Sequence, residues 1–113
     1  MNAQLDPTIL LSTLTRTYEL VQRGWCQGDY AQDEDGRTAM PSSNTACRWS
    51  FSGALHRSLS EKQQGALFPQ VYRVVCQLLP QGHADPEDYS DLPTTTQADV
   101  LALLGRAIEG VNP

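Results

Sequence analysis

The spacing of apolar and polar positions predicts a first amphipathic helix over residues 7–23. Apolar side chains recur there at intervals of three and four residues, namely Leu11, Leu14, Tyr18 and Val21. Asp6 before Pro7 is typical of an N-cap followed by proline at the first helical position, where its missing N–H is not needed. Gly24 follows the last turn, and we expect it to end the helix in a left-handed cap.

After this helix the pattern changes to short extended stretches separated by turn residues. We expect one strand over residues 25–30 and a second over residues 37–40, joined by an acidic turn in which Asp35 precedes a glycine. Two short strands are only marginally stable alone. They must therefore pack on the helices, with Trp25 and Tyr30 as the expected contacts.

The rest of the chain predicts three further helical regions. Ser42, Ser43 and Asn44 are expected to cap a second helix over residues 45–58, in which the small pair Gly53-Ala54 indicates close approach by another backbone. A third region begins with a capping-box pattern at residue 60 and extends to 79, with a break at Pro69. Residues 80–95 lack periodicity and read as a long connection, and the final helix begins after the N-cap Thr96.

These elements predict a mainly α fold, with about four helices around one core and a small β-hairpin between helices one and two. We expect residues 1–113 to form a single domain, because this length is close to the commonest domain size. Apolar residues make up 40% of the chain and aromatic residues only 7%. The core should therefore be aliphatic, and its expected large anchors are Trp25, Trp49, Phe51 and Tyr72.

The charge of the chain changes this picture, because its acidic residues are clustered. The formal net charge is −5, and eight of the thirteen acidic residues fall in two apparent loops: Asp29, Asp33, Glu34 and Asp35, and Asp85, Glu87, Asp88 and Asp91. Binding to a phosphate backbone requires clustered cations, so direct nucleic-acid binding is not expected. Two solvated loops are the favoured interpretation. The alternative is an acidic docking face for a basic partner.

The cysteines and the first residues of the chain indicate the cellular compartment in which we expect the protein. Cys26, Cys47 and Cys76 are widely spaced and odd in number, which argues against a disulfide framework. The opening residues carry no basic leader and only a short apolar run, so we expect no export signal and no transmembrane helix. These features favour a cytoplasmic protein with free thiols and no membrane partner.

The order of motifs resembles a family of small bacterial and phage-borne domains of unknown function. The resemblance rests on four matches that cover almost the whole chain: Gly24-Trp25-Cys26-Gln27-Gly28-Asp29-Tyr30, Asp35-Gly36-Arg37, Cys47 with Gly53-Ala54-Leu55, and Ser90-Asp91 before Thr94-Thr95-Thr96. The spacing from Cys47 to Gly53 is longer than in the family pattern, and an Asn-Asp pair would match better than Ser90-Asp91. The resemblance supports the fold and implies no activity.

Metal and cofactor sites are not expected. Asp33-x-Asp35-Gly36 is similar to an EF-hand loop, but Ala31 and Ser42 fall where the first and last oxygen ligands should be. The cysteines and histidines lack the short spacings of zinc ligands. We therefore assign no metal ligand, no cofactor and no catalytic residue.

Our leading hypothesis is a non-enzymatic acidic interaction or regulatory domain that binds a protein partner or a second copy of itself. The expected partner-binding residues are Trp25, Gln27, Asp29, Tyr30, Asp33, Asp35, Tyr89 and Asp91. For two of them an internal role is favoured, with Trp25 as a core anchor and Tyr30 pinning the hairpin.

Two other hypotheses stay open. One is a small-molecule-binding protein or hydrolase-like enzyme, with a pocket between the hairpin and the 80–95 connection that uses Cys26, His83 and Asp91. The other is an acidic mimic of nucleic acid from a mobile element, which would require the two acidic loops to form one continuous strip.

Overall fold

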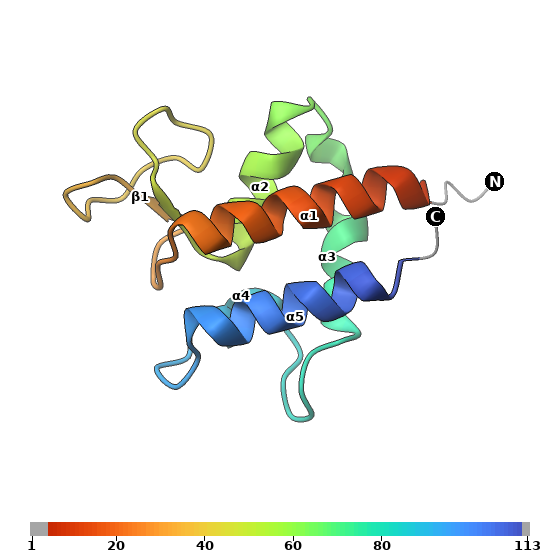
Figure 1. Cartoon of the computed structure of the whole chain (residues 1–113). Helices are drawn as coiled ribbons and strands as arrows, with labels where there is room; N and C mark the ends of the chain where they lie inside the picture. Colours follow the sequence, from red (N-terminus) through yellow and green to blue (C-terminus); the bar gives the residue numbers. More distant parts are fainter. Residues whose placement is uncertain (1–4, 112–113) are drawn as a thin grey trace.

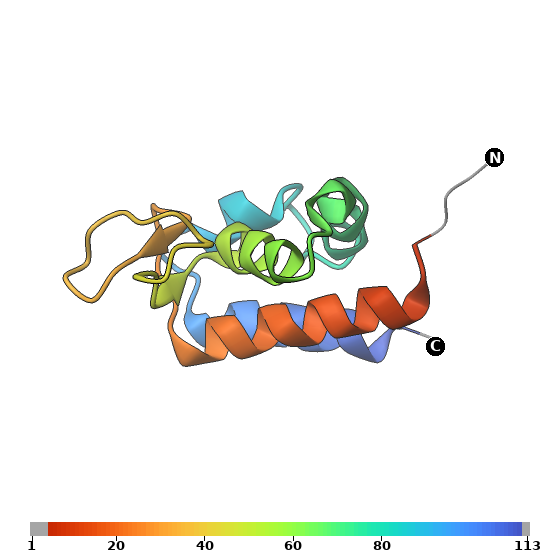
Figure 2. The same ribbon diagram turned by 90° about the horizontal axis from the view of Figure 1, so that it is seen from above.

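The helices lie in two layers around one aliphatic core. The structure is a computed structural model that describes residues 5–111. Helices α1 (Pro7–Arg23) and α5 (Gln97–Glu109) lie side by side in one layer (Figures 1 and 2). The second layer holds α2 (Phe51–Glu61), α3 (Phe68–Cys76) and the short α4 (Pro86–Ser90), with a 3₁₀ turn, η1 (Gly65–Leu67), before α3.

The two longest helices confirm the sequence prediction because their signals are local. The Asp6 side chain accepts a hydrogen bond from the Thr8 N–H and so caps α1. At α5, Thr96 and Asp99 exchange the two hydrogen bonds of a capping box. The amphipathic stripe of α1 buries residues such as Leu14 and Val21 against α5 and α2.

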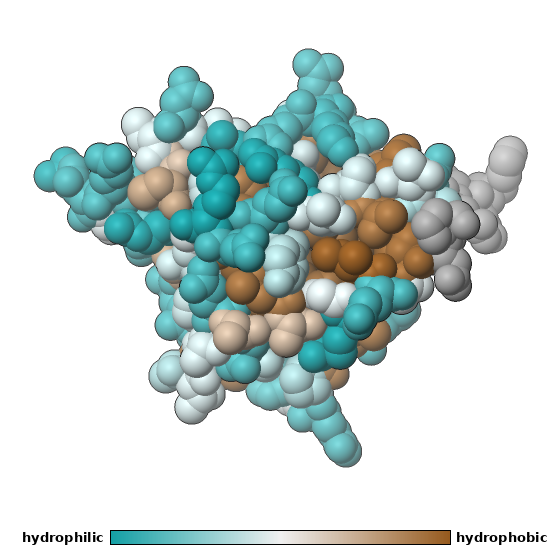
Figure 3. Space-filling view, in the orientation of Figure 1, coloured by the Kyte–Doolittle hydropathy of each residue, from teal (hydrophilic) through white to brown (hydrophobic). Residues whose placement is uncertain are grey.

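The core is mainly aliphatic, as the low aromatic content predicted. Phe51 and Trp49 are buried within it, whereas Trp25 and Tyr72 are half-buried and pack against its edge. On the face formed by α1 and α5, apolar surface gathers between the two helices towards the chain ends (Figure 3). No helix among residues 5–111 is long and apolar enough to cross a membrane.

A small antiparallel strand pair lies between α1 and α2, but its strands differ from those predicted. β1 (Ala31–Gln32) pairs with β2 (Arg48–Trp49), so that Ala31 faces Trp49. Residues 37–40 form no regular strand, but they run back beside β1: Thr38 makes an isolated bridge to Gln32, and the Ala39 N–H donates to the Ala31 carbonyl at 2.9 Å. The predicted hairpin between helices one and two is confirmed, but its second strand comes later in the chain than predicted, because the pairing that buries Trp49 against Ala31 uses a longer loop.

Helix α2 begins six residues later than predicted and ends later as well. Its N-cap is Ser50, whose side chain accepts from the Gly53 N–H, and not the Ser42–Asn44 cluster. Cys47 therefore lies before β2, outside any helix. The position of the cap is set by strand β2, which is held extended by pairing with β1 up to Trp49.

The region from residue 60 to 95 also differs from expectation. Ser60 belongs to α2 and starts no new helix, and Pro69 lies in the first turn of α3, where proline is well tolerated. Residues 86–90 form α4, capped by Asp85, inside the segment expected to be a loop. The structure thus has a fifth α-helix within the predicted mainly α architecture.

Two glycines permit backbone contacts that any side chain would block. A Cβ atom at Gly53 would overlap the backbone carbonyl of Tyr30, and one at Gly24 would overlap that of Cys47. The close approach predicted from Gly53-Ala54 is confirmed. The left-handed cap predicted at Gly24 is wrong: its φ of −172° is extended, and the glycine is needed for space.

Candidate functional site

The segment that follows α1 is bound tightly to the segment around α4. The side-chain amide of Gln27 donates hydrogen bonds to three carbonyl oxygens: Ser90 at 2.9 Å, Leu92 at 2.7 Å and Thr95 at 3.3 Å. The Gly28 N–H donates to Asp91 Oδ1 at 3.1 Å. These bonds place residues 27–30 and α4 side by side, although more than 60 residues separate them in sequence.

Helix α4 is also attached to the N-terminus of α2. Ser90 Oγ accepts from the Phe51 N–H and from the Trp25 indole N–H, each at 3.4 Å. Glu87 Oε1 accepts from the Ser52 N–H at 2.9 Å. The first turn of α2 has free N–H donors, so an acceptor oxygen is favourable there. This contact fixes the backbone of α4 and the direction of its acidic side chains.

Between these segments lies a depression of about 450 Å³, which we call the acidic groove; it is lined by Gly28, Asp29, Tyr30, Thr38, Glu87, Asp88 and Asp91. Asp29 is held by hydrogen bonds from the Thr38 hydroxyl at 2.8 Å and the Gln32 amide at 2.9 Å, and these bonds lower its pKa. One acidic residue from the first loop and three from the second thus meet in one depression.

Not all of these carboxylate oxygens are used within the domain. Among residues 5–111, the Asp88 side chain and the second oxygen of Asp91 receive no hydrogen bond. The ion pairs found among residues 5–111 join Arg16 to Glu19 and Glu61, and Arg57 to Glu61. None of these side chains lines the acidic groove. The acidic groove therefore presents uncompensated negative charge and free acceptor atoms.

An aromatic cluster borders the acidic groove. The His56 ring stacks on Phe68 with centroids 4.1 Å apart, and Phe68 stacks on Tyr72 at 5.2 Å. These rings and Tyr30 line a second depression of about 290 Å³, the aromatic hollow, which shares Tyr30, Glu87 and Asp88 with the groove. The Tyr72 hydroxyl donates to Asp85 Oδ1 at 2.6 Å and accepts from the Glu87 N–H, which ties the cluster to α4.

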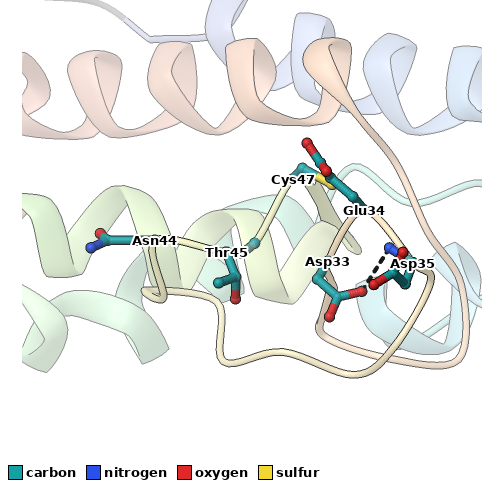
Figure 4. A pocket seen from close by; sticks show the side chains of 7 residues that line it. Asp33, Glu34, Asp35, Asn44, Thr45 and Cys47 are labelled. Carbon is teal, nitrogen blue, oxygen red and sulfur yellow. Dashed lines mark hydrogen bonds between the residues drawn. The ribbon is translucent and has the colours of Figure 1, made fainter.

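The acidic turn after β1 lines a separate depression of about 390 Å³, with Asp33 to Asp35 on one side and residues 44–47 on the other (Figure 4). Asp33 Oδ1 accepts from the backbone N–H groups of Asp35 and Arg37 at 2.9 and 3.0 Å, and so closes the turn. The side chain of Asp35 is exposed. The Asp33 carboxylate therefore stabilises the turn, and the exposed acidic side chains of this turn are Glu34 and Asp35.

The structure gives the eight predicted contact residues different surroundings. Asp29, Tyr30 and Asp91 are brought together in the acidic groove. Asp33 and Asp35 lie at the acidic turn. The side-chain nitrogens of Gln27 and Trp25 donate hydrogen bonds inside the domain, and Tyr89 is half-buried against the core.

Comparison with protein families gives one match. The model of a family described as a family of unknown function, DUF6197, covers residues 6–110. The chain belongs to the DUF6197 family. Comparisons with curated proteins and with solved structures found no match. Membership is consistent with the resemblance seen in the sequence and brings no activity with it.

The three residues considered for an enzyme do not line a common depression in this DUF6197 domain. Asp91 lies in the acidic groove, but Cys26 is buried and its thiol donates to the Asp29 carbonyl at 3.5 Å. Burial and nearby negative charge, chiefly that of Asp29, raise the pKa of Cys26 to about 12, so the unreactive thiol form dominates near neutral pH. His83 is exposed, and its ring lies edge-on to that of Tyr89 with the ring centroids 5.0 Å apart.

Among the residues that the structure describes, no three His, Cys, Asp or Glu side chains are grouped so that they could hold a metal ion.

Sequence reasoning missed part of this site in the DUF6197 domain. The sequence indicates Glu87 and Asp88 only as members of an acidic loop, and it does not predict the ring cluster of His56, Phe68 and Tyr72. Phe68 and Tyr72 stand four residues apart, a spacing that places side chains together on a helix. That signal was available, but the inferred break at Pro69 hid it.

Glu87 gives this site an expected pH dependence. Burial raises its pKa above the ordinary value of 4.5, so the folded state binds more protons than the unfolded state above that pH. The Glu87 contribution to the free energy of unfolding must therefore fall as pH rises from about 4.5 through the raised pKa. Glu87→Gln removes this loss and keeps an acceptor oxygen for Ser52.

We expect Glu87→Gln to gain stability relative to the native sequence as pH increases from 4.5 to 7. Urea unfolding at a series of pH values measures this difference. Glu34→Gln, at an exposed position in the acidic turn, is the control for the loss of one carboxylate. A constant difference between Glu87→Gln and the native protein would contradict the raised pKa.

Proposed function

We propose that this domain is a non-enzymatic interaction module whose acidic groove binds a basic segment of a protein partner. The observation that carries this proposal is the meeting of Asp29, Glu87, Asp88 and Asp91 in one depression whose lining holds no Lys or Arg. A cationic side chain could donate charge-assisted hydrogen bonds to the carboxylates of Asp88 and Asp91 there.

The neighbouring rings support the same ligand chemistry. Tyr30 borders both the acidic groove and the aromatic hollow, and its side chain is 55% exposed. Aromatic faces attract Lys and Arg, and exposed tyrosine is enriched at the energetic centres of interfaces. Carboxylates beside accessible rings favour a cationic peptide over an anionic or neutral ligand.

Two coarser features are part of the proposal. We propose that residues 1–113 act as one domain, since the buried apolar side chains of the described residues form one cluster. A cytoplasmic location is supported by the three free cysteines, which suit a reducing compartment.

The proposal is tested by selecting ligands from a library of short random peptides displayed on phage. We expect the selected peptides to be rich in Lys and Arg. Asp88→Lys should weaken the binding of a selected peptide by about tenfold, measured by fluorescence anisotropy, because reversal replaces attraction with repulsion. Asp88 is exposed and its carboxylate holds no other residue of the described chain, so the fold should persist.

Glu34→Lys is the matched control, because it makes the same charge change at the exposed acidic turn outside the groove. The affinity of Glu34→Lys for the selected peptide should stay within about twofold of the native value when it is measured with enough salt to screen long-range electrostatic effects. Equal affinity of Asp88→Lys and the native protein would overturn the proposal. Analytical ultracentrifugation tests the alternative that the occupant is a second copy of the chain.

A further inference from the structure

A fourth depression, also lined by Tyr30, is mainly apolar. This Met40 hollow has a volume of about 280 Å³ and is lined by Tyr30, Met40, Pro41, Ser42, His56 and Ser60. The side chain of Met40 is 71% exposed, and with Tyr30 it is one of the few large apolar side chains of residues 5–111 that face solvent. Exposed apolar side chains that gather at a depression are typical of a binding surface.

The wall of the Met40 hollow is held in place by Arg57. Its Nη1 donates to the carbonyl oxygens of Pro41 and Ser43 at 3.1 and 2.9 Å, and its Nε donates to Glu61 at 3.1 Å. The guanidinium also lies 5.7 Å from the centre of the Trp49 ring. The loop that carries Met40 is therefore fixed at its base, and the charge of Arg57 is paired with Glu61 rather than facing the hollow.

The Met40 hollow, the aromatic hollow and the acidic groove share one lining residue. Tyr30 lines the Met40 hollow, the aromatic hollow and the acidic groove, and His56 lines the first two. A ligand lying across Tyr30 would contact apolar surface on one side and carboxylates on the other. A small amine fills only one of these spaces, whereas successive side chains of an extended peptide reach both.

We infer that the partner segment is an extended peptide with an apolar side chain in the Met40 hollow and a nearby Lys or Arg in the acidic groove. This inference rests on the proposed function and adds the apolar anchor and its position. The occupant is identified by charge complementarity: Asp29, Asp88 and Asp91 attract the cation, and the Met40 hollow carries no charged side chain that would attract one.

The inference is tested with a selected peptide and two altered forms of it, one with the apolar residue replaced by Ser and one with the cation replaced by Gln. Each is titrated by fluorescence anisotropy against the native protein, Met40→Ser and Asp88→Lys. We expect Met40→Ser to weaken the binding of the parent peptide by about tenfold and to leave the affinity of the Ser-substituted peptide unchanged. Asp88→Lys should likewise weaken binding of the parent peptide and leave the affinity of the Gln-substituted peptide unchanged.

The outcomes separate this inference from the proposed function. If Asp88→Lys weakens binding but Met40→Ser changes no affinity, the apolar anchor is wrong and the basic-peptide function stands. If the library yields no Lys- or Arg-bearing ligand, both are wrong. Met40→Ser alters a side chain that is 71% exposed, so circular dichroism should report an intact fold and any affinity loss is local.

Discussion

Gly53→Ala is expected to destabilise the domain by about 3 kcal/mol or more, a large part of the stability of a small protein. The added Cβ would overlap the carbonyl of Tyr30, which is backbone and cannot rotate away. That carbonyl also accepts from the Ser50 N–H at 3.1 Å, at the N-cap of α2. Relief of the overlap must therefore separate the start of β1 from the start of α2.

The control for this prediction is Gly105→Ala in α5. Gly105 also lies in a helix, but an added Cβ there meets no other atom within 4 Å. Helix propensity then dominates, and we expect a gain of about 0.5–1 kcal/mol. Urea unfolding of the two variants measures both effects. Equal or higher stability of Gly53→Ala would contradict the close contact between Tyr30 and α2.

Gln27→Glu is expected to have the second large effect, a loss of about 3 kcal/mol at neutral pH. The substitution keeps the size of the side chain but replaces the amide donor with an anionic oxygen. Three carbonyl oxygens, those of Ser90, Leu92 and Thr95, would lose their donor and face a negative charge. The junction between residues 27–30 and α4 should therefore open.

Acid provides a further check on Gln27→Glu. A protonated glutamic acid can donate one hydrogen bond and carries no charge, so the loss should shrink as pH falls towards 4. Gln81→Glu, on an exposed loop, is the control and should change the free energy of unfolding by no more than about 0.5 kcal/mol. A Gln27→Glu variant as stable as this control would show that the three hydrogen bonds contribute little.

The effects at these two positions bear on the proposed function, because both contacts build the acidic groove. Gly53 brings Tyr30 against α2, and Gln27 holds Asp29 and Asp91 at the same depression. The sequence predicts Asp29, Tyr30 and Asp91 as contact residues, and the structure places these three in one depression. The sequence does not predict Glu87, Asp88 or Met40, because their position beside the others depends on which loops meet.

Local sequence determined the helices whose signals lie within a few residues. Asp6-Pro7 fixed the start of α1, and the Thr96–Asp99 capping box fixed the start of α5. Capping bonds and apolar periodicity act over one or two turns, so they operate in almost any surroundings. The mainly α architecture follows from these helices and from the aliphatic composition.

Tertiary structure decided the strand pairing, the start of α2 and the site. The sequence offers several serines that could cap a helix near residues 42–50, and Ser50 is used because Trp49 is buried in β2 and because α4 supplies acceptors to the first turn. Choices of this kind depend on distant partners: Trp49 pairs with Ala31 of β1, and the α4 acceptors lie 35 and 39 residues from the α2 donors. Local propensity cannot select among them, because the free energy that separates the alternatives comes from burial and hydrogen bonds made only after the chain has folded.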